Sequence, residues 1–468
     1  MAEDLRADPG SFRDPTSRVY LGEEGVYRGL DANAASVFRL LKATSFYQNL
    51  LEEGLIVASD QHSVENEEFS DLRNDHWASV LVHPKLDVIT YPYEWSFSML
   101  KDAALLQLSL LKAAFDEGFT LKDSTPFNIQ FVGTRPVFID VPSFVRREDG
   151  EVWLGYRQFC MLYLYPLMVQ SYAAVGFQSL LRANIDGITP HDASRLLRGR
   201  AIFRRGVISH VRLTSFLEER MARKQRDTAP PSTRRGPSQS DRMFYGLLDS
   251  MERLVTSLSV EVGRSDWTHY QARNTYTEDD MSNKVEFVTR ALARRRQALV
   301  WDIGCNTGQF SRIAAEHADH VLAVDADHDS VEDFYRKLGT QNTITPLVMD
   351  LSNPSPDLGW ANSERRSFYK RNRPSLVMCL ALIHHIRISA NVPLDLFFDW
   401  LRGLDAEVIV EYVDRDDEMV KKLLANKKET YQDYCRKTFE AELLRRFMIL
   451  DSCEVKDGLR SLYHCSPI

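Results

Sequence analysis

Acidic residues and glycines at the end of a predicted strand are the residues of this chain best suited to hold a ligand. The apolar run Ala298 to Trp301 leads into Asp302-Ile303-Gly304-Cys305-Asn306-Thr307-Gly308, and a helix follows. A strand, a tight turn and a helix N-terminus bind nucleotide-like ligands at the carboxyl ends of strands. Gly304 lets the backbone approach the ligand, and Gly308 lets the helix pack on the strand. Asn306 stands where a further glycine is common, and Asn tolerates left-handed backbone angles.

Further strands are predicted to end at the same edge of the sheet. Val321 to Val324 leads into Asp325, 23 residues after Asp302. An acidic side chain at that point commonly accepts hydrogen bonds from ribose hydroxyls. Three more apolar runs end on Asp350, on His384-His385 and on Glu411. Together these strands predict one α/β ligand site.

This pattern resembles the class I S-adenosylmethionine-dependent methyltransferases, over roughly residues 266–468. The resemblance implies a Rossmann-like seven-stranded α/β sheet with an antiparallel terminal strand, and S-adenosylmethionine as the cofactor. More specifically, the chain resembles bacterial fusions that include nodulation-protein-like methyltransferases, which implies a sugar or other small metabolite as acceptor. The resemblance places cofactor binding on one set of residues: Asp302, Gly304, Cys305, Asn306, Gly308, Asp325 and Asp350.

Three residues after the fourth and fifth strands are candidates for a general base: His384, His385 and Glu411. The alternative is that one histidine packs against the cofactor and the other caps the next segment. No Asn-Pro-Pro-Tyr motif follows the fourth strand, which favours an oxygen or carbon acceptor over an amino group. The middle glycine of the loop is replaced by Asn306, which disfavours an NAD-dependent dehydrogenase. The predicted chemistry requires no metal. Three aromatic residues before the sheet are lid candidates or packing residues: Trp267, Tyr270 and Tyr276.

The N-terminal half carries a second motif. Asp123 is followed five residues later by Asn128, and an apolar strand then ends on Asp140. These residues resemble the catalytic loop and metal-binding Asp of the protein-kinase and aminoglycoside-phosphotransferase fold. The resemblance implies that Asp123 orients an acceptor hydroxyl while Asn128 and Asp140 hold Mg²⁺. Several features of the family are missing, and Arg28 is only a distant stand-in for the lysine that pairs with phosphate. The alternative is therefore that these residues are a hydrogen-bonded structural remnant without catalytic activity.

The elements that position these motifs divide the chain. We expect a kinase-like, degenerate α+β domain with its own core over 1–221, a flexible linker over 222–241, and a methyltransferase domain over 242–468. The last comprises a helical cap over 242–297 and a Rossmann-like core over 298–468. In the first domain we expect a hairpin over 19–27, helical spacing over 34–53, strands over 79–82 and 87–91, and a long helix after Trp95.

Composition limits the class of protein. The chain has 468 residues, 44% apolar and 26% charged, with a formal net charge of −8, which disfavours nucleic acid as the main partner. Its six cysteines form no C-x-x-C pair and suggest reduced thiols. No signal peptide is evident, and the longest apolar stretch, 159–169, is too short to span a bilayer. We therefore expect a cytoplasmic protein with a small-molecule acceptor and no membrane partner.

Three hypotheses follow. The first is a cytoplasmic methyltransferase with a kinase-like N-terminal domain. The second is a small-molecule kinase with a regulatory methyltransferase-like domain. The third is a non-catalytic scaffold that uses both folds as binding modules.

Overall fold

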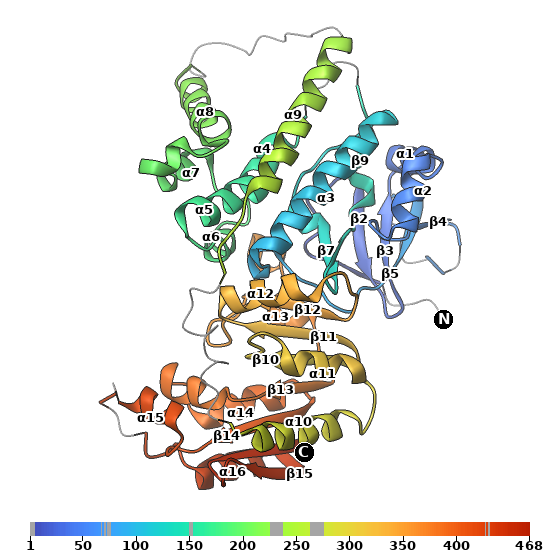
Figure 1. Cartoon of the computed structure of the whole chain (residues 1–468). Coiled ribbons are helices and arrows are strands. Elements are labelled where there is room, and N and C mark those ends of the chain that lie inside the picture. The colour runs from blue at the N-terminus through green and yellow to red at the C-terminus, as the bar shows by residue number, and fades with distance from the viewer. Residues whose placement is uncertain are drawn as a thin grey trace.

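The computed structural model describes residues 5–66, 68–69, 72, 76–148, 153–224, 237–262, 276–425, 427–428 and 431–468. The chain forms two halves, one above the other in Figure 1. The upper half holds a small antiparallel sheet and many helices. The lower half is a sheet covered by helices on both faces.

The lower sheet has seven strands in the order β12-β11-β10-β13-β14-β16-β15. The first five are parallel, and β16 runs antiparallel between β14 and β15. This confirms the α/β class and the antiparallel terminal strand. The strands are β10 (Gln297–Ile303), β11 (Ala318–Asp325), β12 (Ile344–Val348), β13 (Leu376–Cys379), β14 (Glu407–Val413), β15 (Phe447–Val455) and β16 (Arg460–Pro467).

The strand order reverses at β10, which pairs with β11 on one side and with β13 on the other. A reversal of this kind opens a crevice at the carboxyl ends of the strands. The helices around the sheet are α10 (Glu278–Leu292), α11 (Gln309–His317), α12 (His328–Leu338), α13 (Phe368–Arg371), α14 (Leu394–Gly403), α15 (Glu418–Leu424) and α16 (Arg436–Leu444).

The upper half begins with a five-stranded sheet of order β1-β2-β3-β5-β4. The hairpin expected over 19–27 is β2 and β3, and the helical spacing over 34–53 forms two helices, α1 and α2. The elements are β1 (Arg6–Ala7), β2 (Ser17–Leu21), β3 (Gly25–Leu30), α1 (Ala32–Lys42), α2 (Ser45–Glu52), β4 (Asp60–Ser63) and β5 (Ser79–Pro84).

The strand expected over 87–91 is absent from the described structure, and this prediction was wrong. The segment does not pair in a sheet, and remote side chains accept hydrogen bonds from two of its backbone N–H groups. The N–H of Ile89 donates to the Asn372 side chain at 2.8 Å, and that of Thr90 donates to the Gln130 side chain at 2.8 Å. An alternating apolar pattern cannot tell this arrangement from a strand paired in a sheet.

The long helix expected after Trp95 is α3 (Phe97–Asp116), and two short sheets and a helical region follow it. Residues 159–169 form the buried helical stretch expected there. The elements are β6 (Phe119–Leu121), β7 (Ile129–Val132), β8 (Arg135–Phe138), β9 (Phe144–Arg146), α4 (Tyr156–Phe159), η5 (Cys160–Leu164), α5 (Tyr165–Ala173), α6 (Gln178–Ala183), α7 (Pro190–Leu196), η6 (Gly199–Phe203), η7 (Val207–Arg212) and α8 (Leu213–Lys224).

Helix α9 (Pro237–Ser257) lies on the half opposite to the one expected. It runs beside α3 in Figure 1, with the Phe244 and Phe115 rings stacked 3.9 Å apart and Lys112 paired with Asp249 at 2.9 Å. The boundary at residue 242 therefore does not follow the packing, because α9 covers the N-terminal half. Of the expected linker, residues 225–236 lie outside the described residues.

The two halves are packed together rather than tethered. One hydrophobic cluster contains Trp95 and Leu100 of the N-terminal half together with Trp301 and Leu322 of the C-terminal sheet. The separate N-terminal core expected from the sequence is thus continuous with one face of that sheet. A buried ion pair between Arg371 and Glu94 crosses the same interface.

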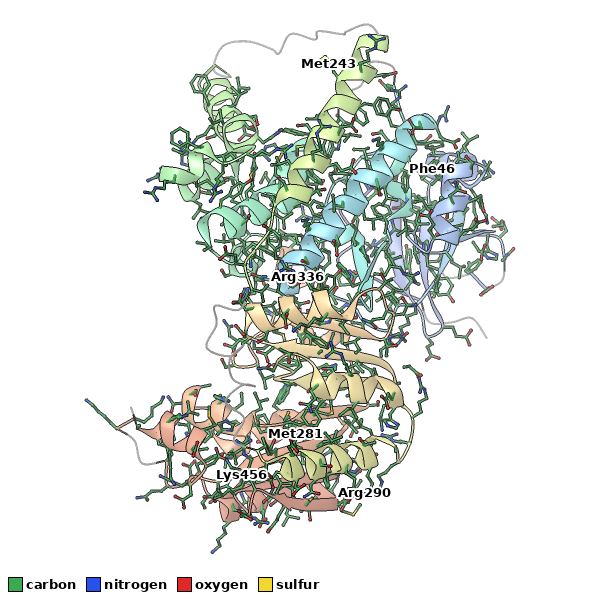
Figure 2. The ribbon with its side chains drawn as sticks, in the orientation of Figure 1. Phe46, Met243, Met281, Arg290, Arg336 and Lys456 are labelled. Carbon is green, nitrogen blue, oxygen red and sulfur yellow. The ribbon has the colours of Figure 1, made fainter. Side chains whose placement is uncertain are left out.

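Helix α12 makes much of this contact. The Glu332 carboxylate accepts hydrogen bonds from the backbone N–H and the hydroxyl of Ser98, at 2.9 and 2.5 Å. The Tyr335 hydroxyl donates to Asp102 at 2.8 Å. Arg336, labelled in Figure 2 where the halves meet, donates to the Val260 carbonyl at 3.3 Å. Within the described residues, no helix is long and apolar enough to cross a membrane.

Candidate active site

The loop between β10 and α11 is hydrogen-bonded to the neighbouring strand, β11. The N–H groups of Gly304 and Cys305 both donate to the Val324 carbonyl of β11, at 2.8 and 3.1 Å. Asn306 has a φ of 49°, so it adopts the left-handed conformation that the sequence suggested. The Cys305 thiol is buried, and burial raises its pKa well above the ordinary value, so it stays protonated.

The two loop glycines serve different purposes. A side chain on Gly304 would meet only the Leu382 side chain, at 3.4 Å, so this position leaves room for a close approach. A Cβ on Gly308 would lie 1.9 Å from the Phe334 ring of α12, and the Gly308 φ is 79°. Gly308 therefore admits the packing of α12, whereas the sequence analysis attributed it to packing of helix on strand.

Asp325 joins this loop to the carboxyl end of β11. One carboxylate oxygen accepts from the Asn306 N–H at 2.8 Å, and the other accepts from the Asp327 N–H at 2.9 Å. Burial raises the pKa of Asp325, while these donors lower it. The two bonds fix the carboxylate plane, and each oxygen keeps a further lone pair for a ligand hydroxyl.

Asp302 and Asp350 differ in exposure. Asp302 is 2% exposed and accepts from the Ser311 hydroxyl at 2.6 Å, and burial raises its pKa to about 6. Asp350, two residues after β12, is exposed and accepts from the Ser352 N–H at 2.8 Å. The predicted acidic residues thus stand at the carboxyl ends of three neighbouring strands, β10, β11 and β12.

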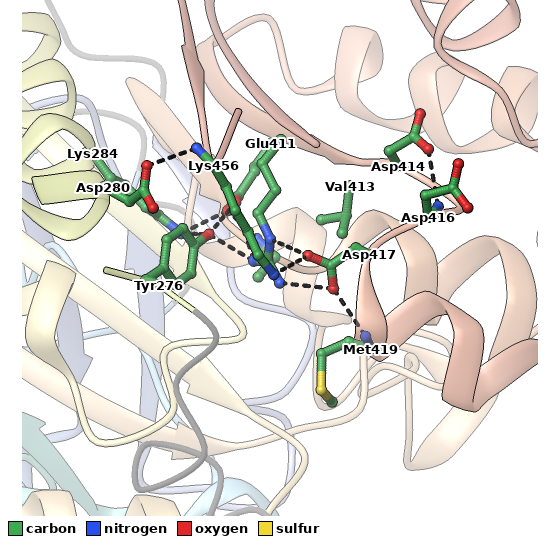
Figure 3. A network of polar contacts seen from close by, with 12 residues as sticks. Tyr276, Asp280, Lys284, Glu411, Val413, Asp414, Asp416, Asp417, Met419 and Lys456 are labelled. Carbon is green, nitrogen blue, oxygen red and sulfur yellow. Dashed lines mark hydrogen bonds and ion pairs between the residues drawn. The ribbon is translucent and has the colours of Figure 1, made fainter. Parts of the chain in front are cut away.

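Glu411 is fully buried at the carboxyl side of β14 and is surrounded by donors (Figure 3). Lys284 of α10 lies 2.6 Å from one oxygen and Arg460 of β16 lies 3.3 Å from the other, and Tyr276 donates a short hydrogen bond. Burial would raise the pKa of Glu411, but the two cations lower it to about 2. Because Glu411 is fully buried and cations engage both of its oxygens, it cannot meet an acceptor, and we do not retain it as the proton acceptor.

Glu411 instead holds the end of the neighbouring strand. It accepts from the N–H of Ala381, at 2.7 Å, just beyond β13. Ala381 has a φ of 50°, a left-handed conformation that costs free energy for a residue with a side chain. The buried carboxylate therefore helps to shape the turn that leads into His384 and His385.

The network continues past Glu411. Arg460 also donates to Asp417 at 3.0 Å, and Lys456 lies 2.7 Å from Asp417. Burial would raise the pKa of Asp417, and the two cations lower it to about 2. Alternating charges thus connect α10, β14, the start of α15 and β16 (Figure 3).

Three residues of this network were not predicted from the sequence: Lys284, Asp417 and Arg460. The buried position of Lys284 could have been predicted from its spacing in the sequence. In α10 the buried residues follow helical spacing, and Lys284 stands first in that stripe, ahead of Phe287, Val288, Ala291 and Leu292. A lysine at a core position of an amphipathic helix indicates a buried anionic partner.

The two histidines follow β13 as predicted, but their environments differ. His384 is fully buried, neither ring nitrogen has a hydrogen-bond partner, and burial lowers its pKa well below the ordinary value. His385 is half-buried, and burial lowers its pKa to about 4. Both rings are neutral near pH 7. The exposure of His385 makes it the better placed of the two to meet an acceptor.

The lid candidates are only partly described. Trp267 and Tyr270 lie outside the described residues. Tyr276 is bonded to Glu411 and accepts from Arg460 at 2.6 Å, so it is a member of the buried network.

The kinase-like residues come together in the N-terminal half. The Asn128 side chain donates to one oxygen of Asp140 at 3.1 Å, and Arg28 of β3 forms a close ion pair with the other. Burial raises the pKa of the nearby Asp123, and the Asp140 charge adds to this rise. Both oxygens of Asp140 are therefore engaged, one by a cation. Among the described residues, no group of three or more His, Cys, Asp or Glu side chains is arranged to hold a metal ion.

The strand order, the reversed last strand and the acidic edge define the C-terminal half as the α/β sheet that the class I methyltransferase resemblance implied. No family model matches the chain. The chain is 34% identical to the nodulation protein NoeA of Rhizobium meliloti (strain 1021) over 458 residues, which is 97% of this chain and 94% of that protein. It therefore belongs to the NoeA family.

Two solved structures are similar to part of the chain. The N-methyltransferase NodS of Bradyrhizobium japonicum WM9 aligns with 41% of this chain and 98% of its own, at 10% identity and a TM-score of 0.31. The magnesium protoporphyrin IX methyltransferase ChlM of Synechocystis PCC 6803 aligns with 44% of this chain and 90% of its own, at 18% identity and a TM-score of 0.30. Both TM-scores are low, and it is the strand order of the sheet that defines the fold.

Proposed function

We propose that this protein is an S-adenosylmethionine-dependent methyltransferase. The observation that supports it most is the placement of Asp302, the Gly304–Gly308 loop and Asp325 together where the strand order reverses. The residues fit the cofactor: the position of Gly304 is open, and Asp325 is oriented by two backbone donors. Bound S-adenosylmethionine would supply an electrophilic methyl group on its sulfonium.

The protein residues then have distinct tasks. Asp325 would accept from the ribose hydroxyls, exposed Asp350 would accept from the adenine, and Asp302 would attract the amine of the cofactor. Catalysis consists mainly of alignment, because the methyl group is already activated. His385, half-buried after β13, is our candidate for orienting the acceptor and receiving its proton. His384 and Glu411 support the turn beside it.

Calorimetry with S-adenosylhomocysteine tests this function. The whole chain should bind it in the micromolar range, and Asp325→Asn should abolish or greatly weaken binding, because an amide cannot accept at both positions. Asp319→Asn is the matched control on the same strand, since Asp319 is exposed and pairs only with a surface arginine in the described contacts. Absence of binding by the wild-type chain, or equal binding by both variants, would contradict the proposal.

The acceptor belongs to the same proposal. The missing Asn-Pro-Pro-Tyr motif supports an oxygen or carbon acceptor, and the resemblance supports a sugar or other small metabolite. Hydroxylated metabolites should take up label from methyl-labelled S-adenosylmethionine, and His385→Ala should reduce that uptake without weakening cofactor binding. Uptake by amines alone would reject the oxygen or carbon acceptor while leaving the methyltransferase function in place.

The N-terminal half is, in our proposal, a kinase-like domain that supports the sheet and does not transfer phosphate. The pairing of Arg28 with Asp140 favours this, because a guanidinium stands where the family places a metal. Calorimetry with ATP and Mg²⁺ should therefore show no binding. Mg²⁺-dependent ATP binding that is lost in Asp140→Ala would favour the kinase hypothesis. If the chain binds neither ATP nor S-adenosylhomocysteine, the result would favour the hypothesis of a non-catalytic scaffold.

A further inference from the structure

Exposed apolar side chains are concentrated in one stretch of the N-terminal half. Of the 16 large apolar residues that are exposed in the described chain, six lie within residues 196–217. Phe203 is 84% exposed, Ile208 is 59% exposed and Phe216 is 58% exposed. The other three are Leu196, Leu213 and Leu217. Single exposed apolar residues are ordinary, but a contiguous group marks an interaction surface.

These residues belong to elements that touch one another. Helix α7 and η6 both contact η7, which continues without a break into α8. Val207, Val211 and Ser215 face the core along η7 and α8, while Ile208, Leu213 and Phe216 face outward. In Figure 1, α7 and α8 form an outer corner of the molecule, away from the C-terminal sheet. We call the exposed residues of these elements the α7–α8 surface.

The same surface is strongly basic. Between Pro190 and Glu218 the sequence has six arginines and only two carboxylates, although the whole chain has a net charge of −8. One carboxylate, Asp192, accepts from Thr189 at its helix cap, and the other, Glu218, pairs with Arg157 at 2.7 Å. Five of the arginines are exposed beside the apolar residues: Arg195, Arg198, Arg200, Arg204 and Arg205.

The combination of exposed apolar side chains and arginines limits the kind of partner that can bind the α7–α8 surface. A second copy docked about a two-fold axis would place the arginines of both copies close together, which is repulsive. Nucleic acid would neutralise the arginines but would leave the Ile and Leu side chains in water. A bilayer with anionic headgroups accommodates both the apolar side chains and the arginines. The apolar side chains enter the interface, while the arginines remain at the level of the phosphates.

We propose that the α7–α8 surface docks this protein on an anionic membrane surface. The chain lies on the bilayer and does not span it. The sequence predicted no membrane partner, because the prediction rested on the absence of a spanning segment. The exposure of these apolar residues is visible only in the fold. The proposal is independent of the methyltransferase function.

Vesicle flotation of the full chain tests this docking. The wild-type chain should float with phosphatidylcholine vesicles containing about 30 mol % phosphatidylserine and not with pure phosphatidylcholine vesicles. Raising the salt from about 0.05 M to about 0.5 M should reduce the bound fraction, because it shortens the screening length.

Two double variants separate the contributions. Phe203→Ser with Phe216→Ser should weaken binding about tenfold by removing buried apolar area. Arg200→Glu with Arg205→Glu should weaken it about tenfold or more, because both charges reverse. The matched control is Arg39→Glu with Leu40→Ser on α1, an exposed Arg and Leu on another face, and it should bind like the wild type.

Three outcomes would overturn the proposal. The first is no flotation of the wild-type chain at low salt. The second is equal loss of binding in the α1 control and in the α7–α8 variants. The third is a concentration-dependent dimer that only the Phe203→Ser, Phe216→Ser variant abolishes, which would assign the surface to a second copy. Unchanged circular dichroism in each variant ensures that a loss of binding is not a loss of fold.

Discussion

Glu332 of α12 caps the first turn of α3, a helix that belongs to the other half of the chain. Its carboxylate accepts from both the backbone N–H and the hydroxyl of Ser98. The first N–H groups of a helix lack partners within the helix, and a carboxylate there also interacts favourably with the helix dipole. Since α12 starts three residues after Asp325, the N-terminal half braces the segment that we assign to ribose binding.

Removal of this cap should weaken both the fold and the ligand site. Glu332→Ala should lower the free energy of unfolding by about 1.5–3 kcal/mol, because charged hydrogen bonds to a buried helix end are lost. S-adenosylhomocysteine affinity should fall as well, by about 0.5–2 kcal/mol. Urea denaturation and calorimetry measure the two effects. Asp333→Ala, on the same helix but paired only with Lys337 in the described contacts, should change neither by more than about 1 kcal/mol.

Lys284 should be among the most sensitive residues of the C-terminal half. Lys284→Met keeps the apolar stem but removes a cation from the fully buried Glu411. Breaking a buried ion pair in this way costs about 3–5 kcal/mol, measured as a lower urea midpoint. Lys456→Met is the milder comparison, because Lys456 is more exposed and Asp417 keeps Arg460. Equal effects of the two substitutions would contradict the central role of Glu411.

The same network predicts sensitivity to acid. Glu411 and Asp417 have pKa values of about 2 in the fold, below their ordinary values of 4.5 and 3.8. Their contribution to stability is therefore complete above those ordinary values, and it is lost as the pH falls toward about 2. In Lys284→Met the pKa of Glu411 should rise, so acid unfolding should begin at a higher pH. Fluorescence-monitored acid titration of both proteins checks the direction.

Asp302 predicts a separate pH effect, on ligand binding and at a higher pH. Burial raises its pKa to about 6, so below that pH the carboxyl is neutral and no longer attracts an amine. The affinity for S-adenosylhomocysteine should fall as the pH drops below about 6, approaching tenfold per unit, provided that only the ionised form binds. Asp302→Asn should bind weakly at every pH and lose this dependence. A wild-type affinity that stays constant through this range would remove Asp302 from the amine site.

Gly308 should not tolerate even a methyl group. Gly308→Ala would place a carbon 1.9 Å from the Phe334 ring and would force a left-handed alanine, so a loss of about 2–5 kcal/mol is expected. Gly339→Ala provides the control, because its φ is also positive at 61° but nothing lies within 4 Å of the new carbon. With its ψ at −157°, it should lose about 1–3 kcal/mol from backbone strain alone. Phe334→Leu should partly restore Gly308→Ala in urea denaturation.

Local patterns predicted the C-terminal half well. The strand, loop and helix around Asp302 could be identified because their apolar periods and glycines lie within about one dozen residues. Arg371 and Glu94 could not be predicted to form a buried ion pair, because they lie far apart in the sequence. Each alone is indistinguishable from an ordinary charged residue at the surface. The same reason explains the error over residues 87–91, whose backbone partners are the side chains of Asn372 and Gln130.

The position of α9 has a practical consequence for dissecting this protein. The chain cannot be cut between Lys224 and Pro237 into two autonomous pieces, although composition alone makes that the obvious place. Such a cut would uncover Phe115 on the N-terminal piece and leave Phe244 unpacked on the other. A cut after α9 would still separate Arg371 from Glu94 and Glu332 from Ser98. Complementation between separately expressed fragments should therefore require that both be present while they fold.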